Sequence, residues 1–121
     1  MEKGNKWIMI VKIFDYLEEN DIEVYFVGQK TGTCTSNYVV VKDAGTLGYD
    51  GGNKVGNQLI DLLFFVPQNC YTEMEEFKNN IKELMKDFNE VRYTGQETPI
   101  ITDDDYKALS CSVMYQNQKL L

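Results

Sequence analysis

The chain has 121 residues, a net charge of −7 and a composition of 43% hydrophobic and 26% charged residues. The length fits a single domain over residues 1–121, and the composition is that of a globular protein rather than a disordered one. The acidic balance argues against specific binding to nucleic acid, and no apolar run is long enough to predict a membrane span.

The first half of the chain predicts one helix and two strands. The helix is expected over residues 3–19, because apolar side chains recur at helical spacing. This stripe consists of Trp7, Ile10, Val11, Phe14 and Leu17. A β-branched and aromatic segment at residues 23–27 predicts the first strand. A polar loop over residues 29–37 then leads to a second strand at residues 38–42.

A glycine-rich stretch follows at residues 43–57, with glycines at 45, 48, 51, 52 and 56. Asp50-Gly51 is a typical hairpin turn, so we expect a hairpin with a long mobile tip. The returning strand is expected at residues 58–66, where Pro67 ends it.

The second helix is expected over residues 71–89. Thr72 and Glu75 have the spacing of a capping box at its start. An apolar face then runs along it for about four turns. Its members are Met74, Phe77, Ile81, Leu84, Met85 and Phe88.

The C-terminal part predicts a short strand at residues 91–93, a loop over residues 94–105 and a final alternating strand. Within this loop, the apolar pair Ile100-Ile101 could extend a strand. In the final strand Leu109, Cys111, Val113 and Tyr115 share one face. The order α-β-β-β-α-β-β predicts an α+β two-layer sandwich, with both helices on one face of a mostly antiparallel sheet of four to five strands. The expected core is Ile10, Phe14, Leu17, Val40, Ile60, Leu62, Phe64, Phe77, Ile81, Leu84, Phe88, Leu109 and Val113.

Catalytic signals are missing from the sequence. The chain contains no histidine, so Ser-His, Cys-His and His-metal arrangements cannot form within it. The three cysteines, at 34, 70 and 111, have neither zinc-site nor disulfide-framework spacing, which is typical of an intracellular protein. The glycine-rich stretch lacks the P-loop pattern, and the acidic run at residues 103–105 lacks a calcium-loop pattern. We therefore expect no enzyme, no cofactor and no metal site.

The glycine-rich stretch is instead the candidate interaction element. A loop with this many glycines is costly to order alone and gains structure where a partner supplies contacts. Leu47, Tyr49 and Val55 are its apolar side chains, and Lys54 could pair with an acidic partner. Tyr49 is the best anchor, because aromatic residues dominate interface hot spots. A flexible hairpin tip without a partner is the alternative.

Taken in order, these segments resemble a known family. The matching features are the aromatic strand at residues 24–27, the Tyr-Val-Val-Val strand at 38–41, the long glycine-rich hairpin, the Leu-Ile-Asp-Leu-Leu-Phe-Phe-Val strand at 59–66 and the Tyr-x-Ala-x-Ser-x-Ser-Val-x-Tyr strand at 106–115. Nearly the whole chain resembles the small tail terminator, or tail-completion, proteins of long-tailed bacteriophages and prophages.

The resemblance implies a structural protein of the virion tail or neck, assembled in the host cytoplasm. It implies a homo-oligomeric ring, typically a hexamer, that caps the tail tube and joins it to the head-side connector protein. DNA would pass through the ring without specific binding. Two alternatives remain: another neck component, such as a head-completion or stopper protein, and a small monomeric ligand-binding or regulatory domain with residues 43–57 as a lid.

Overall fold

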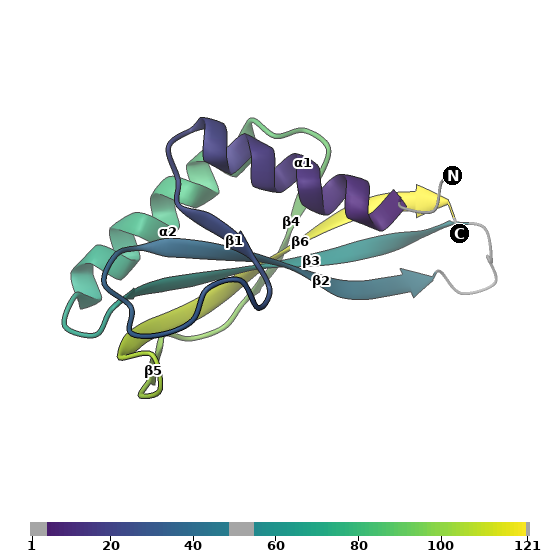
Figure 1. The fold of residues 1–121 in the computed structure, drawn as a ribbon. Coiled ribbons are helices and arrows are strands. Elements are labelled where there is room, and N and C mark those ends of the chain that lie inside the picture. Colours follow the sequence, from purple (N-terminus) through teal and green to yellow (C-terminus); the bar gives the residue numbers. More distant parts are fainter. Residues whose placement is uncertain (1–4, 49–54, 121) are drawn as a thin grey trace.

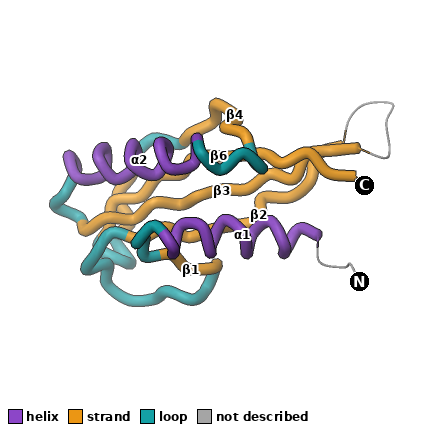
Figure 2. The backbone as a smooth tube through the Cα atoms, turned by 90° about the horizontal axis from the view of Figure 1, so that it is seen from above, coloured by secondary structure: helices purple, strands orange, loops and turns teal. Residues whose placement is uncertain are grey.

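The computed structural model describes residues 5–48 and 55–120. The elements in order are α1 (Asn5–Glu19), β1 (Val24–Phe26), β2 (Tyr38–Gly48), β3 (Val55–Pro67), α2 (Tyr71–Lys86), β4 (Arg92–Glu97), β5 (Ile101–Asp103) and β6 (Ala108–Leu120). Both helices lie side by side on one face of the sheet, as Figure 1 and Figure 2 show. The predicted two-layer α+β class is confirmed. No helix in the described ranges is long and apolar enough to cross a membrane.

The sheet has six strands in the order β1-β2-β3-β6-β4, and β5 pairs with β6 next to β4. β1 pairs with β2 in parallel, whereas the other pairs are antiparallel. The sheet is therefore mixed and larger than the predicted four to five strands. The prediction of a loop over residues 94–105 was wrong for residues 94–97, which belong to β4, and for residues 101–103, which form β5. Both strands pair with β6. The extension of β4 is short and polar, so only its pairing with β6 reveals it, whereas the apolar pair Ile100-Ile101 indicates a strand where β5 begins.

The hairpin of β2 and β3 is longer than predicted. Its pairs run from Tyr38 with Phe65 to Gly48 with Gly56. A bulge interrupts the register between Asp43 and Gly45, where Gly45 has a φ of 106° that favours glycine. The N–H of Gly45 donates to Asp43 Oδ1 at 2.9 Å. The prediction of a loop over residues 43–57 was thus wrong for residues 43–48 and 55–57, which are strand. Residues 49–54 lie outside the described part.

Alternation along the strands builds the core beneath the helices. The buried residues of the strands on this face include Val39, Val41, Ile60, Leu62, Phe64, Val66, Leu109, Cys111, Val113 and Tyr115. The predicted core is confirmed for most of its members, with Phe14, Phe77, Leu84 and Phe88 only partly buried. Val40 was placed wrongly. It packs against a second cluster on the other face of the sheet, since its neighbours Val39 and Val41 point to the helices.

The apolar stripe of α1 is shifted from the predicted one. Ile13 is completely buried, whereas Val11 is 41% exposed. Ile10 and Leu17 are buried as expected. The side chain of Trp7 lies outside the described part. Spacing alone allowed two neighbouring stripes, and the position of the sheet selects the one through Ile13.

The start of α2 also differs from the prediction. Cys70 is the N-cap, and no side chain caps the helix. The Thr72–Glu75 capping box is therefore wrong, because both residues already lie inside the helix. The helix ends at Lys86, three residues before the predicted end. Its buried face is confirmed, with Met74, Ile81 and Met85 buried against the sheet.

Truncation of Ile81 should destabilise the fold strongly. Its side chain is fully buried in the core, so Ile81→Ala should lower the free energy of unfolding by about 2–5 kcal/mol through the cavity it leaves. Leu84→Ala is the matched control on the same helix. Leu84 is only partly buried, so its loss should cost clearly less. Equal denaturant midpoints for both variants would contradict this packing of α2.

A serine at position 70 should stabilise α2. With Cys70 as N-cap, Glu73 occupies the third helical position, so Cys70→Ser would create a Ser-x-x-Glu capping box. We expect the melting temperature to rise by about 3–5 °C. Cys70→Ala supplies no capping oxygen and should give no increase. A serine variant that melts no higher than the alanine variant would exclude this cap geometry.

Candidate functional site

A three-stranded arm projects from one end of the sheet. We define the arm as residues 45–48 of β2, 55–58 of β3 and 117–120 of β6, and Figure 1 shows these strands running together past β1 and β4. β1 pairs with β2 only as far as Val41, and β4 reaches β6 only as far as Gln116. Among the described residues, no strand lies against the outer edge of either β2 or β6 in the arm. Only β3, in the middle, is paired on both sides.

An open strand edge is a template for another strand, because it presents unpaired backbone N–H and C=O groups. Natural proteins usually protect such an edge with charged side chains, proline or bulges. The β2 edge over residues 44–48 reads Ala-Gly-Thr-Leu-Gly, without charge or proline, and the bulge lies at its start. The β6 edge over residues 117–120 contains one charged residue, Lys119. The arm can therefore bind another β-strand through its backbone.

The structure places two of the four predicted interaction residues, Leu47 and Val55, on strands of this arm. Leu47 pairs with Asn57, and Val55 pairs with Leu120, so both lie on strands rather than in a loop. Their side chains lie outside the described part, as do Tyr49 and Lys54 entirely. The predicted loop backbone is thus wrong at Leu47 and Val55, and the role of these residues in an interaction stays a prediction.

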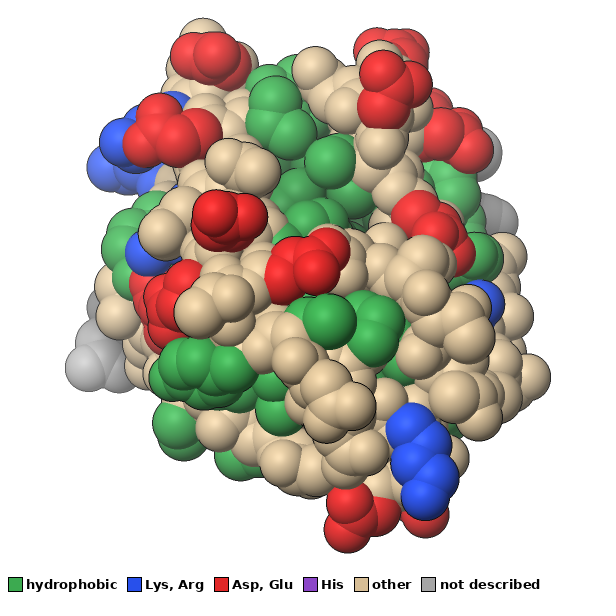
Figure 3. Space-filling model, turned by 90° about the vertical axis from the view of Figure 1, so that its left-hand side faces the viewer, with side chains coloured by type: hydrophobic (Ala, Val, Ile, Leu, Met, Phe, Trp, Pro, Cys, Tyr) green, Lys and Arg blue, Asp and Glu red, His purple; other side chains and the backbone are tan. Residues whose placement is uncertain are grey.

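The opposite end of the molecule has a different surface. Figure 3 shows hydrophobic side chains in a hollow there, with acidic side chains around them. In the described part of the chain, three large hydrophobic residues have more than half of their surface exposed: Val27 at 61%, Tyr71 at 57% and Ile101 at 57%. Apolar surface with a charged rim is typical of contact surfaces between proteins.

A pocket of about 440 Å³ lies between the end of α2 and the start of β4. Its lining residues are Lys82, Met85, Lys86, Asn89, Val91, Arg92, Tyr93 and Tyr115. Met85, Val91 and Tyr115 are buried and form an apolar floor. Burial raises the pKa of the Tyr115 hydroxyl, with smaller contributions from Tyr93 and Glu97. Three of the twelve basic residues of this acidic chain lie at the pocket.

Glu97 connects the wall of this pocket to α2. Its carboxylate lies 3.2 Å from Lys78 Nζ and 2.5 Å from Lys82 Nζ, and it accepts a hydrogen bond from the Tyr93 hydroxyl. The Lys82 ammonium also lies 4.9 Å from the centre of the Tyr93 ring, a cation–π contact. Hydrogen bonds from Lys82 and Tyr93 lower the pKa of Glu97 to about 2. This cluster fixes β4 against the helix.

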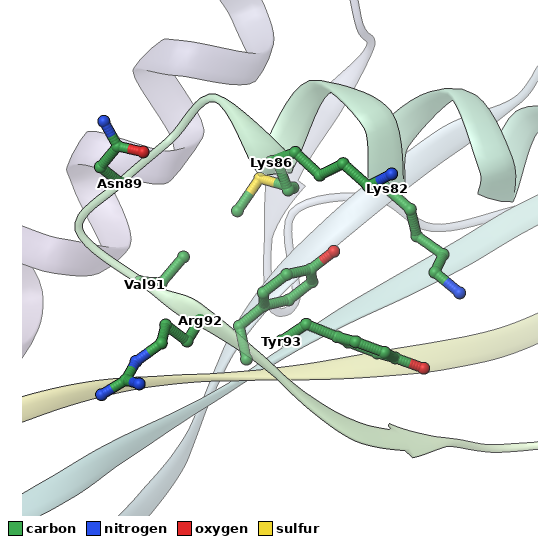
Figure 4. A pocket seen from close by; sticks show the side chains of 8 residues that line it. Lys82, Lys86, Asn89, Val91, Arg92 and Tyr93 are labelled. Carbon is green, nitrogen blue, oxygen red and sulfur yellow. The ribbon is translucent and has the colours of Figure 1, made fainter.

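The basic groups of the pocket do not converge on one point. In Figure 4 the Arg92 guanidinium points away from Lys82 and Lys86. Lys82 is bound to Glu97, and Lys86 forms an exposed pair with Glu83 at 2.9 Å. The pocket is thus suited to an apolar group with a negative charge at its rim rather than to a phosphate held by several cations. The sequence contains a signal for the basic side of this pocket. Lys82 and Lys86 lie one helical turn apart, and the only arginine of the chain, Arg92, follows shortly after the helix.

The other face of the sheet carries an aromatic cluster that the sequence did not predict. Tyr25, Tyr38, Phe65 and Tyr106 pack there around the buried Cys34, and Lys30 lies 5.6 Å from the rings of both Tyr25 and Tyr38. Burial raises the pKa of Tyr38 to about 12. Tyr25, Tyr38 and Phe65 alternate with helix-facing residues along β1, β2 and β3, so the cluster stabilises the sheet on its second side.

The acidic run at residues 103–105 forms the turn between β5 and β6. Asp103 Oδ1 accepts the backbone N–H groups of Asp105 and Tyr106 at 3.1 and 3.2 Å. Within the described ranges, no cluster of three or more acidic or cysteine side chains could hold a metal ion. The run therefore has a local role in closing the turn.

Comparison of the sequence with models of known protein families gives no match. Comparison with curated proteins gives no match either.

Acidification should weaken the fold through Glu97. Its pKa lies at about 2 in the folded protein, below its ordinary value of 4.5. The contribution of the Glu97 carboxylate to the free energy of unfolding is therefore complete above pH 4.5 and is lost as the pH falls towards 2. Glu97→Gln should lower the melting temperature at pH 7, and the difference from the parent protein should shrink across this window.

Glu90→Gln is the matched control for this prediction. Glu90 pairs with Lys12 at 2.8 Å, but both side chains are nearly half exposed, so this pair should contribute little. Thermal melts of the three proteins from pH 7 to pH 2 provide the comparison. A Glu97→Gln effect that stayed constant over this range would show that the carboxylate charge is not what stabilises β4.

Proposed function

We propose that this protein is a structural neck protein of a bacteriophage or prophage, and specifically a tail terminator. In this role copies form a ring, expected to be a hexamer, that caps the tail tube and joins it to the head-side connector protein. The ring is assembled in the host cytoplasm and resides in the virion. Its role is structural, without catalysis or a cofactor.

The observation that carries this proposal is the arm with its two open edges. A subunit with one exposed edge on each side of the same arm can bind a neighbour at both, and a closed ring leaves no edge exposed. The arm consists of the β2–β3 hairpin and the end of β6, so it presents both a long hairpin and open sheet edges for such contacts.

Two further features agree with an adaptor between two partners. The molecule has different surfaces at its two ends, the arm at one and a hydrophobic hollow with acidic side chains around it at the other. A net charge of −7 also suits a ring through which DNA slides, because like charges repel the phosphate backbone. The tail tube and the connector protein would each contact one end.

Another neck component, such as a head-completion or stopper protein, would use the same arm to form a ring. An assay of tail-tube capping distinguishes such a protein from a terminator, because only a terminator caps the tube. A small monomeric ligand-binding or regulatory domain is the second candidate, and the pocket beneath α2 favours it. The lid in that hypothesis must be shorter than residues 43–57, because the ends of this segment are strands of the sheet.

The first test is the mass and activity of the purified protein. Native mass spectrometry and electron microscopy should show a ring of several 14.0 kDa subunits. Added to growing tail tubes, the ring should stop their elongation. A protein that remained monomeric at all concentrations, also when tubes are present, would exclude the terminator role and favour the ligand-binding domain.

Shortening the arm should abolish the ring without unfolding the domain. In one variant Asn-Gly replaces residues 47–57, which closes the hairpin at the Thr46–Gln58 pair, and the chain ends at Asn117. The core beneath the helices remains, so we expect cooperative melting but monomeric protein. Circular dichroism and sedimentation velocity measure the two properties.

The matched control replaces only residues 49–54 by Asn-Gly and keeps both edges of the arm. It should still assemble and cap tubes, because the strand edges rather than the tip are proposed to carry the contact. If the control lost its ring as completely as the shortened arm, the tip with Tyr49 and Lys54 would be the assembly element. If both variants assembled, the arm would have no role in the ring.

A further inference from the structure

We infer that neighbouring copies are joined by a parallel β-ladder, in which β2 residues 44–48 of one copy lie beside β6 residues 117–120 of the next. This inference rests on the proposed ring and names the surfaces that close it. It assigns one occupant, a second copy of this chain, to both open edges of the arm.

Strand direction is the first argument. β2 and β6 are each antiparallel to β3, so both run from the body of the sheet towards the end of the arm. In a ring every copy is related to the next by rotation about one axis, and the arms keep the same direction along that axis. The β2 edge of one copy then meets the β6 edge of its neighbour in parallel.

Use of both edges is the second argument. A two-fold dimer could instead pair β2 with β2 in the antiparallel direction, which is slightly more stable per residue. Such a dimer would leave the β6 edge of each copy open, and a β6–β6 dimer would leave β2 open. The β2–β6 ladder covers both edges in every copy, so it removes the template for uncontrolled strand addition.

Matching levels along the arm are the third argument. Gln58 pairs with Thr46 on one side and with Asn117 on the other, so these two edge residues lie at the same height. Both edges are open from this level to the end of the described strands. Thr46 is exposed and Asn117 is half-buried, so both positions tolerate small substitutions.

Cysteine cross-linking tests the ladder directly. The background is Cys70→Ser, since Cys34 and Cys111 are buried. Thr46→Cys and Asn117→Cys are introduced together, and the assembled protein is treated with an oxidant or with a short bismaleimide linker that tolerates a small shift in register. We expect a denaturing gel to show nearly complete loss of the monomer band and a ladder up to the full ring.

The controls separate the possible pairings. Each single variant should stay monomeric on the gel, whereas a mixture of the two single variants should give cross-linked dimers and nothing larger. Thr46→Cys combined with Thr102→Cys, an exposed position on β5 away from the arm, should give no ladder. Dimers from Thr46→Cys alone would indicate the two-fold β2–β2 pairing and overturn the inference.

Native mass and hydrogen exchange of the unaltered protein complete the test. The amides of residues 46–48 and 117–119 that point away from β3 should exchange slowly in the ring and at least tenfold faster in subunits dissociated by dilution. A ring with fast exchange at these amides, or with no ladder from the cysteine pair, would overturn the inference and leave the ring itself standing. An unaltered protein that is monomeric by native mass would overturn both the inference and the proposed function.

Discussion

The pairing of β3 on both of its sides is the constraint on which the rest of the structure depends. It pairs with β2 on one side and along its full length with β6 on the other. Because side chains alternate along it, Leu62 and Phe64 face the helices while Leu63 and Phe65 face away. A slip of one residue would exchange the two faces, so the burial of the core fixes both ladders at once.

The arm follows from the same constraint. β1 has three residues and β4 has six, so neither flanking strand extends as far as β3 and its two neighbours. A three-stranded arm whose two edges have little protection among the described residues is a hazard for an isolated protein and an advantage for a subunit. The length of β3 thus connects the internal packing of the domain to its proposed assembly.

Several polar side chains of the described residues hold elements of the fold together. Glu97 unites Lys78, Lys82 and Tyr93, and this cluster ties β4 to α2 and forms a wall of the adjacent pocket. On the other face, Lys30 lies near the aromatic cluster. Charged groups that already have partners in this way stabilise the fold.

The sequence by itself determined the elements that carry strong periodicity. The apolar face of α2 and the alternation of Leu109, Cys111 and Val113 in β6 predicted the α+β class, because these patterns depend on neighbours along the chain. Only the tertiary structure decided the parallel pairing of β1, the extension of β2 through Gly45 and the meeting of Glu97 with α2. These features depend on residues distant in sequence. Glycine-rich and short polar segments become strands only when an already formed strand supplies their hydrogen bonds.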